Sequence, residues 1–342
     1  MNFLQEAYMR KQRLRKLSAI TPCFLALAAI LFFTGLARSE YPERPVTIIV
    51  GFEAGGAADL LTRGVVIGAS QYLKQPIVVE NKGGGGGSVA LAVVATAKPD
   101  GYTLCQAPDV AVVDTALIQK VTYKPLKSFT PIIGLGAATH TALLVKNDAP
   151  WKTFDEFIDY AKRNPGKIKY GSAGVGTGMH IVMEIVAQKD GIKWVHVPYK
   201  SAVPARTALM GGHIDAVSSS IDWPPFVQSG QLRVLATHGE KRSPYFPDVP
   251  TLKEMGYNAV NFTVQAIVGP AGLPPEVVKK LEDAFVKGME TTEFKAVREK
   301  LYMSPVSLNS KEYDQYLKEK WGRTEKLFKE TGIIKEAATQ PY

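Results

Sequence analysis

The sequence predicts an α/β fold of two lobes joined by two crossing strands. Strand and helix patterns alternate along the chain, which is typical of mainly parallel sheets covered by helices. A short strand, a glycine turn and a helix follow one another twice, at residues 46–63 and again at residues 168–182. The chain has 342 residues and 46% of them are apolar, which suffices for two domains of ~100–200 residues each.

Residues 1–39 have the composition of a secretory signal peptide. Basic residues between positions 10 and 16 precede a thirteen-residue apolar run at positions 24–36, and small residues flank a cleavage site near Ser39. The run is shorter than the ~20 residues of a membrane-spanning helix, so we expect cleavage and export to the periplasm rather than a retained anchor. The leader carries +5 of the formal charge of +9, so the mature chain keeps +4 and no long basic cluster. Nucleic-acid binding is therefore not expected.

The sequence contains no recognisable catalytic or metal-binding motif. Only Cys105 is left after cleavage, and the five histidines lack the spacing of a zinc site. Neither a G-x-S-x-G elbow nor a Walker lysine is present. We therefore expect no enzyme and no cofactor. An exported hydrolase-like enzyme, or a ligand sensor not coupled to transport, is the alternative.

The first lobe begins with the strand Val46–Val50, whose β-branched apolar residues predict burial on both faces. Gly55 and Gly56 end this strand, and Asp59 opens a helical pattern. The residues expected on its apolar face are Leu61, Val65, Ala69 and Tyr72. A glycine turn before a helix presents free N–H groups at the positive helix end, which is a ready anion site. A plain turn with Asp59 as the N-cap is the alternative.

The remaining elements follow in order. In lobe one we expect strands at 76–80 and 102–107 with a helix at 88–97 between them. In lobe two we expect strands at 142–145, 168–172, 194–199, 211–217 and 232–236, and helices at 153–163, from 179 onward and at 204–210. The first of these helices is capped by Thr153 or Asp155. The strand 264–268 returns the chain to lobe one, and Pro274-Pro275-Glu276, with Pro at the first helical position, opens the C-terminal amphipathic helices. The predicted domains are 1–39 (leader), 40–141 plus 266–342 (lobe one) and 142–265 (lobe two).

The second lobe repeats the glycine turn after a strand that ends at Ser172. His180 lies in the first turn of the helix that follows. A neutral His180 can donate a hydrogen bond to a ligand, and the alternative is a helix-terminal histidine satisfied by local backbone. Two such turns that face each other across a hinged cleft suit a small anion.

Short motifs in a fixed order reveal a family resemblance. They include Tyr41-Pro42-Glu43-Arg44-Pro45-Val46, Phe52-x-Ala54-Gly55-Gly56-x-x-Asp59, Pro99-Asp100-Gly101-Tyr102-Thr103-Leu104, Gly174-x-Gly176-Thr177-x-x-His180 and His196-Val197-Pro198-Tyr199-Lys200. From Tyr41 to Leu281 the chain resembles the Bug-type receptors, the extracytoplasmic solute-binding proteins of tripartite tricarboxylate transporters.

The resemblance implies a type II periplasmic-binding-protein (Venus-flytrap) fold that closes on a small carboxylate-bearing solute. It also implies delivery to a membrane permease with a large and a small subunit; we expect the receptor to be a monomer. In the family, backbone amides and hydroxyls of the two glycine turns hold the carboxylates. Carried onto this sequence, the binding residues are Phe52, Ala54, Gly55, Gly56 and Asp59 in lobe one and Ser172, Ala173, Gly176, Thr177 and His180 in lobe two.

Several positions depart from the family pattern: Gly51 replaces Pro, Glu53 replaces a neutral residue, the glycine run 83–87 replaces a mixed segment, and Ser201 replaces Gly. A Glu53 carboxylate ~4 Å from a solute carboxylate would cost about 4 kcal/mol at an effective dielectric near 20. Glu53 therefore points to solvent or to a basic side chain, which is favoured, or meets a solute that carries an amine. The resemblance also implies that the loops at Pro108-Asp109 and Ser218–Trp223 supply specificity. Together with Asp109 and Asp222 from these loops, Glu53 motivates the hypothesis that the solute is not a simple polyanion. The expected solute is therefore either a small carboxylate or a zwitterion.

Overall fold

The computed structural model describes residues 9, 40–243 and 246–342. The predicted leader lies outside these residues apart from Met9. The chain divides into an N-terminal unit, Met1–Glu43, and a compact unit, Arg44–Tyr342, which contains both sheets. Within the described part of the chain, no helix combines the length and the apolar character needed to cross a membrane.

The first sheet has five strands in the order β2-β1-β3-β10-β4 and defines lobe one. β1 (Val46–Val50) lies between β2 (Ile77–Asn81) and β3 (Thr103–Gln106) and is parallel to both. β10 (Thr263–Pro270) is antiparallel to β3 and to β4 (Phe129–Ala138). Two segments that are distant in sequence therefore complete one sheet.

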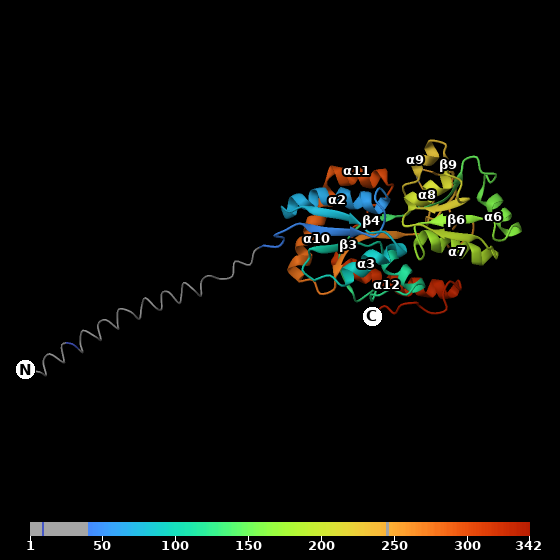
Figure 1. Ribbon diagram of the computed structural model, residues 1–342. Helices are drawn as coiled ribbons and strands as arrows, with labels where there is room; N and C mark the ends of the chain where they lie inside the picture. The colour runs from blue at the N-terminus through green and yellow to red at the C-terminus, as the bar shows by residue number, and fades with distance from the viewer. Residues whose placement is uncertain (1–8, 10–39, 244–245) are drawn as a thin grey trace, which may run out of the picture. The chain divides into compact units, whose positions relative to one another are not determined.

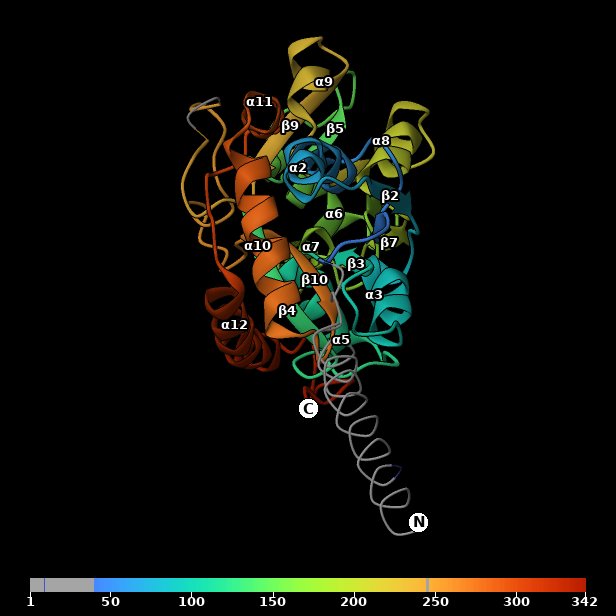
Figure 2. The same cartoon turned by 90° about the vertical axis from the view of Figure 1, so that its left-hand side faces the viewer.

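Helices cover both faces of this sheet (Figures 1 and 2). α2 (Ala57–Leu73) and α3 (Ser88–Ala95) lie on opposite faces (Figure 1), as the strand order β2-β1-β3 requires if both crossovers follow the right-handed rule. α10 (Pro275–Glu290) and α11 (Thr292–Lys300) pack on α2, and α12 (Ser310–Glu330) packs on β4. The short elements η1 (Gly85–Gly87), α4 (Asp109–Val112) and α5 (Asp114–Ile118) occupy the loops.

The second sheet repeats this arrangement and defines lobe two. Its order is β7-β6-β8-β5-β9, with β6 parallel to β7 and β8, and β5 antiparallel to β8 and β9. The strands are β5 (Ala142–Lys146), β6 (Lys169–Ser172), β7 (Val195–Pro198), β8 (Ala216–Ser219) and β9 (Leu232–Thr237). The helices are α6 (Phe154–Arg163), α7 (Gly178–Asp190), α8 (Ala202–Met210) and α9 (Pro224–Gln228). Residues 139–141 form one connection between the sheets, and the second connection includes residues 238–243 and 246–262. The predicted two-lobed α/β fold is therefore confirmed, and the exact lobe boundaries stay a prediction.

The structure confirms most of the predicted elements and corrects two details of α2. Thr153 caps α6 by accepting the Glu156 N–H, and Pro275 is the first residue of α10. Asp59 is not the N-cap of α2, because the helix already begins at Ala57 with Gly56 as its cap. Tyr72 is 39% exposed, since it lies at the edge of the buried stripe formed by the other three residues of the predicted face.

β4 is the strand that the sequence analysis did not predict. It contains Pro131, Gly134 and Gly136, and both residue types are depleted in strands. The glycines are needed because residues 303–308 pack closely on the strand. A Cβ at Gly134 would lie 3.2 Å from Leu308, and one at Gly136 would lie 3.2 Å from Met303.

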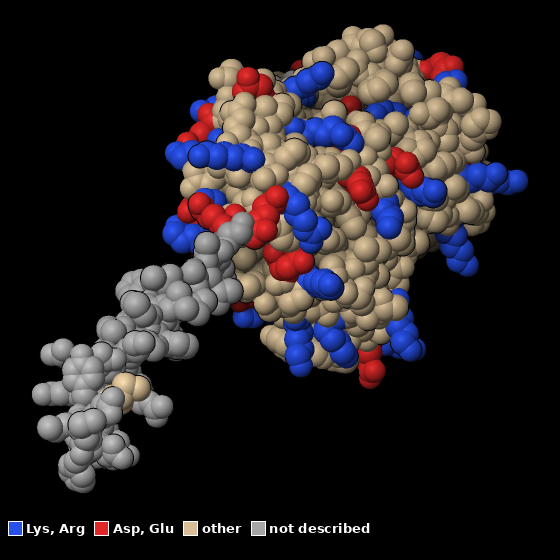
Figure 3. Space-filling view, turned by 60° about the vertical axis from the view of Figure 1, so that its left-hand side comes forward, with Lys and Arg blue, Asp and Glu red and all other residues tan. Residues whose placement is uncertain are grey.

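Charged side chains of both signs alternate over the surface. On the face shown in Figure 3, Lys and Arg are interspersed with Asp and Glu. Several pairs join successive helical turns, for example Lys279 and Asp283 at 2.9 Å. Such exposed pairs contribute little to stability, because water and salt screen them. This face therefore offers no continuous basic surface of the kind that nucleic acid requires.

Candidate functional site

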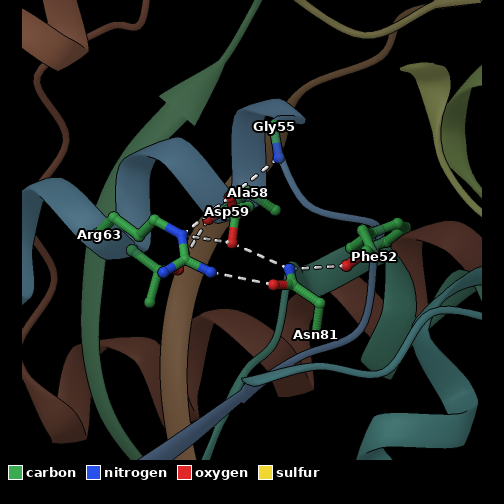
Figure 4. A network of polar contacts seen from close by, with 7 residues as sticks. Phe52, Gly55, Ala58, Asp59, Arg63 and Asn81 are labelled. Atoms are coloured by element: carbon green, nitrogen blue, oxygen red, sulfur yellow. Dashed lines mark hydrogen bonds and ion pairs between the residues drawn. The ribbon is translucent and has the colours of Figure 1, made fainter. Parts of the chain in front are cut away.

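The turn between β1 and α2 is held by the carboxylate of Asp59, at the third position of α2 (Figure 4). It accepts the Gly55 N–H and Asn81 Nδ2, each at 2.9 Å, and Arg63 Nε lies 3.0 Å away. Asn81 Nδ2 also donates to the Phe52 carbonyl at 3.0 Å. Burial alone raises the pKa of Asp59, but the hydrogen bonds from Arg63, Gly55 and Asn81 outweigh burial and lower it. Asp59 is therefore an ionised residue that fixes the shape of the turn.

Two histidines hold the corresponding turn between β6 and α7. His196 Nε2 lies 2.7 Å from Ser172 Oγ, which in turn accepts the Gly174 N–H at 3.2 Å. His180 Nδ1 accepts the Gly176 N–H at 3.3 Å, and the two imidazole rings stack with centroids 4.2 Å apart. Burial lowers the pKa of His180, and burial together with the neighbouring His180 lowers the pKa of His196 to about 3. Both rings are therefore neutral near pH 7, and His180 makes the local backbone contact that was the alternative to ligand donation.

Three helices begin at the carboxyl ends of the parallel strands with uncapped N-termini. The N-cap residues are Gly56 for α2, Thr177 for α7 and Ser201 for α8, and no side chain of the three makes a capping hydrogen bond. The amides of a first helical turn have no acceptor within their own helix. Each N-terminus also carries the positive end of a helix dipole. These turns therefore offer backbone donors and positive potential. The first turns of α7 and α8 contain no acidic residue, and the Asp59 carboxylate in the first turn of α2 is engaged by Gly55, Asn81 and Arg63.

The three N-termini border one cavity between the lobes. The cavity has a volume of about 60 Å³, which is room for about four to six waters. The lining residues are Phe52, Gly56, Ala57, Ala58, Pro108, Val110, Ala138, Thr141, Ala173, Thr177, Met179, Ser201, Ala202, Ser220, Asn261, Thr263 and Gln265. Lys, Arg, Asp and Glu do not occur among them. The cavity is thus small, lined largely by apolar groups, and polar only through hydroxyls, amides and backbone N–H groups.

A hydrogen-bonded chain forms the cavity wall beside the crossing segments. Thr263 Oγ1 donates to Asn261 Oδ1 at 2.9 Å, and Asn261 Nδ2 donates to Thr141 Oγ1 at 3.0 Å. Gln106 Nε2 donates to Gln265 Oε1 at 2.7 Å, which leaves the Gln265 NH₂ group available for another acceptor. This wall is therefore preorganised and adds further donors.

The structure brings some of the predicted binding residues to the cavity and keeps others behind it. Phe52, Gly56, Ala173 and Thr177 line the cavity. The turn residues Ala54, Gly55, Asp59, Ser172, Gly176 and His180 do not line it; of these, Gly55, Asp59, Ser172, Gly176 and His180 take part in the hydrogen bonds that shape the two turns. Glu53 points away from the cavity, with its side chain 44% exposed and its Oε1 3.8 Å from Lys200 Nζ. This is the solvated, Lys-facing position that the sequence analysis favoured.

Asp109 does not present its carboxylate to the cavity. It is fully buried in lobe one, where Tyr316 Oη donates to Oδ2 at 2.5 Å and Lys320 Nζ lies 3.7 Å away. Lys320 is also 3.3 Å from Asp114. Burial raises the pKa of Asp109 and raises that of Asp114 to about 7, while Lys320 acts in the opposite direction. The neighbours Pro108 and Val110, rather than Asp109, form the cavity wall.

Asp222 is likewise directed into its own lobe. Its Oδ2 lies 2.9 Å from Arg206 Nη2, and the two side chains are 9% and 7% exposed. The Arg206 guanidinium stacks over Phe226 with 4.3 Å to the ring centroid. Ser220 of the same loop lines the cavity instead. Because Glu53, Asp109 and Asp222 all point elsewhere, they give no support to the hypothesis of a solute that is not a simple polyanion.

Sequence reasoning missed the contributions of α8 and of the second crossing segment. Ser201 and Ala202 open α8, and Asn261, Thr263 and Gln265 line the cavity from the chain that returns to lobe one. The signal for α8 was present, since a strand ending at Tyr199 is followed by a helix, as in the two glycine turns. No glycine marked it, so the pattern was overlooked.

The glycine run of lobe one touches the glycine turn of lobe two beside the cavity. A Cβ at Gly86 would lie 2.6 Å from the Val175 carbonyl oxygen, and one at Gly174 would lie 3.0 Å from the Gly86 nitrogen. Gly176 approaches Thr115 in the same way, with 2.7 Å from its virtual Cβ to Cα. Backbone meets backbone here without room for a side chain. The lobes are therefore closed against each other in this structure.

Comparison with known proteins identifies the family. Residues 61–333 match the model of the tripartite tricarboxylate transporter family receptor, TctC. The UPF0065 protein in the gbd 5′ region of Cupriavidus necator is 40% identical over 296 residues, which cover 86% of this chain and 90% of that protein. The solved structure of the periplasmic binding protein BugD is 30% identical with a TM-score of 0.80, and covers 86% of this chain and 99% of its own. MatC from Rhodopseudomonas palustris with bound malate is 27% identical with a TM-score of 0.78, covering 84% and 99%.

The predicted Bug-type resemblance is thereby confirmed, and the family and the neighbouring structures consist of solute-binding proteins rather than enzymes. The chain belongs to the tripartite tricarboxylate transporter family of receptors and is a periplasmic solute-binding protein.

Proposed function

We propose that this receptor captures a small carboxylate-bearing solute in the cavity between its lobes. The observation that carries the proposal is the meeting of three uncapped helix N-termini at a cavity lined by no acidic or basic side chain. Backbone N–H groups at helix N-termini favour anions through hydrogen bonds and through the helix dipole. The hydroxyl and amide groups of the lining residues supply further donors. An ammonium group would find no carboxylate partner among the lining residues, so an anion is favoured over a zwitterion.

The cavity size further restricts the solute. A cavity that holds about four to six waters accepts a compact metabolite with few carbons. Malate, the solute named for the related MatC structure, is a molecule of this class. The small volume and the apolar residues Phe52, Pro108 and Val110 disfavour large or strongly branched solutes.

We infer that the cell exports the chain, removes residues 1–39 and uses the closed, loaded receptor to supply a membrane permease with a large and a small subunit. Support comes from the family match and from the composition of the N-terminal segment. Mass spectrometry of the exported protein tests the cleavage, and solute uptake by cells that lack this receptor or its permease tests the coupling.

Solute capture is tested by a thermal-shift screen. The exported protein is purified, unfolded and refolded to remove bound solute, and screened against carboxylates, amino acids and betaines. A ligand at a free concentration of 100 times its Kd stabilises the folded state by about 2.7 kcal/mol, which raises the midpoint temperature of thermal unfolding measurably. We expect a shift with one class of small carboxylate. A shift with cationic or zwitterionic compounds only would refute the proposal.

A further inference from the structure

We propose that the hydroxyl of Ser201 binds the solute directly and determines which solutes the receptor selects. The inference rests on the proposed function and deepens it by adding a side-chain contact to the backbone donors of the three N-termini. Ser201 lies at the N-cap of α8 and lines the cavity. Its side chain belongs to neither of the two glycine turns.

The hydroxyl of Ser201 is buried and has no partner. The residue is 2% exposed, and its Oγ makes no hydrogen bond within the protein. Other described side chains also carry a buried atom without a partner, but among them Ser201 alone lines the cavity. Burying a hydroxyl without a partner is unfavourable, because it loses its hydrogen bonds to water. A solute in the cavity would restore that hydrogen bond.

The local sequence explains why the hydroxyl is free. A serine at an N-cap usually accepts the N–H of the second or third helical residue. In α8 the third residue is Pro204, which has no N–H, and Ser201 makes no capping bond to the second residue either. The backbone of Ser201 is extended, with φ −163° and ψ 176°, so any residue is tolerated at this position. The serine therefore serves neither the capping of the helix nor a special backbone conformation.

A buried ion pair anchors the helix that begins after Ser201. Arg206, one turn along α8, forms the buried ion pair with Asp222. This pair anchors the helix to the loop that contributes Ser220 to the same cavity. The amides of Ala202 and Val203 lie at the same N-terminus. A solute carboxylate can therefore accept the Ser201 hydroxyl and an amide together, or a solute hydroxyl can exchange a hydrogen bond with Ser201 Oγ.

Calorimetric titration of malate and succinate, which differ by one hydroxyl, tests the inference on the exported protein. Ser201→Ala removes the hydroxyl, and Ser219→Ala is the matched control. Ser219 is also fully buried with an unpartnered Oγ, but it does not line the cavity. Ser201→Gly is a second variant, because glycine is well tolerated at N-caps. Unliganded Ser201→Ala and Ser219→Ala should melt no lower than wild type, since each change removes an unpaired hydroxyl.

We expect Ser201→Ala and Ser201→Gly to bind about 10- to 100-fold more weakly than wild type, and Ser219→Ala to bind within about twofold. If these variants lose affinity for malate alone, the Ser201 hydroxyl contacts the hydroxyl of the solute. If they lose affinity equally for malate and succinate, it contacts a carboxylate. Equal affinities of wild type and Ser201→Ala would overturn the inference while the proposed function stands. Binding of neither probe by wild type would refute small dicarboxylates as the solute class, and this inference with them.

Discussion

The contact between the glycine run and the second lobe predicts that Gly86→Ala impairs closure of the receptor. The added methyl carbon would lie 3.0 Å from Thr115 Oγ1 within lobe one, and 2.6 Å from the Val175 carbonyl oxygen and 3.5 Å from Thr177 in lobe two. The two contacts with lobe two exist only while the lobes are closed. The control is Gly230→Ala, because Gly230 has nearly the same backbone conformation, with φ +71° against +65°, and no atom within 4 Å of its virtual Cβ.

The magnitude follows from these contacts. An alanine in the left-handed region costs about 1–2 kcal/mol, and both variants incur this cost. Overpacking in a tight contact costs a further 1–3 kcal/mol, roughly, and applies only to Gly86→Ala. The part caused by Val175 and Thr177 is specific to the closed form, whereas the contact with Thr115 lies within lobe one and affects both forms. A penalty on the binding-competent state weakens the apparent affinity by the same free energy, which is about 5- to 150-fold.

Calorimetry and small-angle X-ray scattering, with and without the carboxylate identified by the thermal-shift screen, measure the two consequences. Gly86→Ala should bind the carboxylate more weakly than wild type and contract less on binding. Gly230→Ala should bind and contract like wild type, although its folded state is destabilised by the same backbone cost as that of Gly86→Ala. If Gly86→Ala binds within about twofold of Gly230→Ala, the contact does not govern closure and the reasoning is refuted.

Three further predictions concern the charged residues that shape the site. Asp59→Asn should lower the free energy of unfolding by about 2–4 kcal/mol in urea titrations, because the charge-assisted hydrogen bonds from Gly55, Asn81 and Arg63 are weakened or lost. A loss as small as that of the exposed control Asp283→Asn would contradict the role given to Asp59. Lys320→Met should cost about 3–5 kcal/mol, since it leaves the Asp109 and Asp114 pair buried without its cation; a variant as stable as wild type would show that the pair is uncharged. Burial raises the pKa of Asp114 from 3.8 to about 7, so its contribution to stability is fully present below about pH 4 and is lost as pH rises to about 7. Asp114→Asn should therefore remove a downward slope of stability across that range, and an unchanged slope would argue against the shift.

The sequence by itself determined the class of the molecule and its local architecture. Alternating strand and helix patterns, the glycine turns at residues 51–56 and 173–178, and the helix start at Pro275 are local signals, because they depend on propensities and on backbone conformation. They were sufficient to predict a two-lobed α/β fold, while the receptor class followed from the family motifs. The anion site at the glycine turns stays a prediction. β4 was missed because its glycines disfavour a strand by propensity. They are accommodated because the distant segment 303–308 packs closely on them, which local sequence does not reveal.

Only the tertiary structure decided which side chains face the cavity. The hypothesis of a solute that is not a simple polyanion requires Asp109, Asp222 and Glu53 to face the solute, although a position toward solvent or a basic side chain is favoured for Glu53. Their directions are set instead by Lys320, Arg206 and Lys200, cations that lie on other elements. Long-range pairing of this kind leaves no periodic trace in the sequence. The same holds for Ser201 and the wall of Asn261, Thr263 and Gln265, which meet at one cavity because both crossing segments and three helix N-termini converge there.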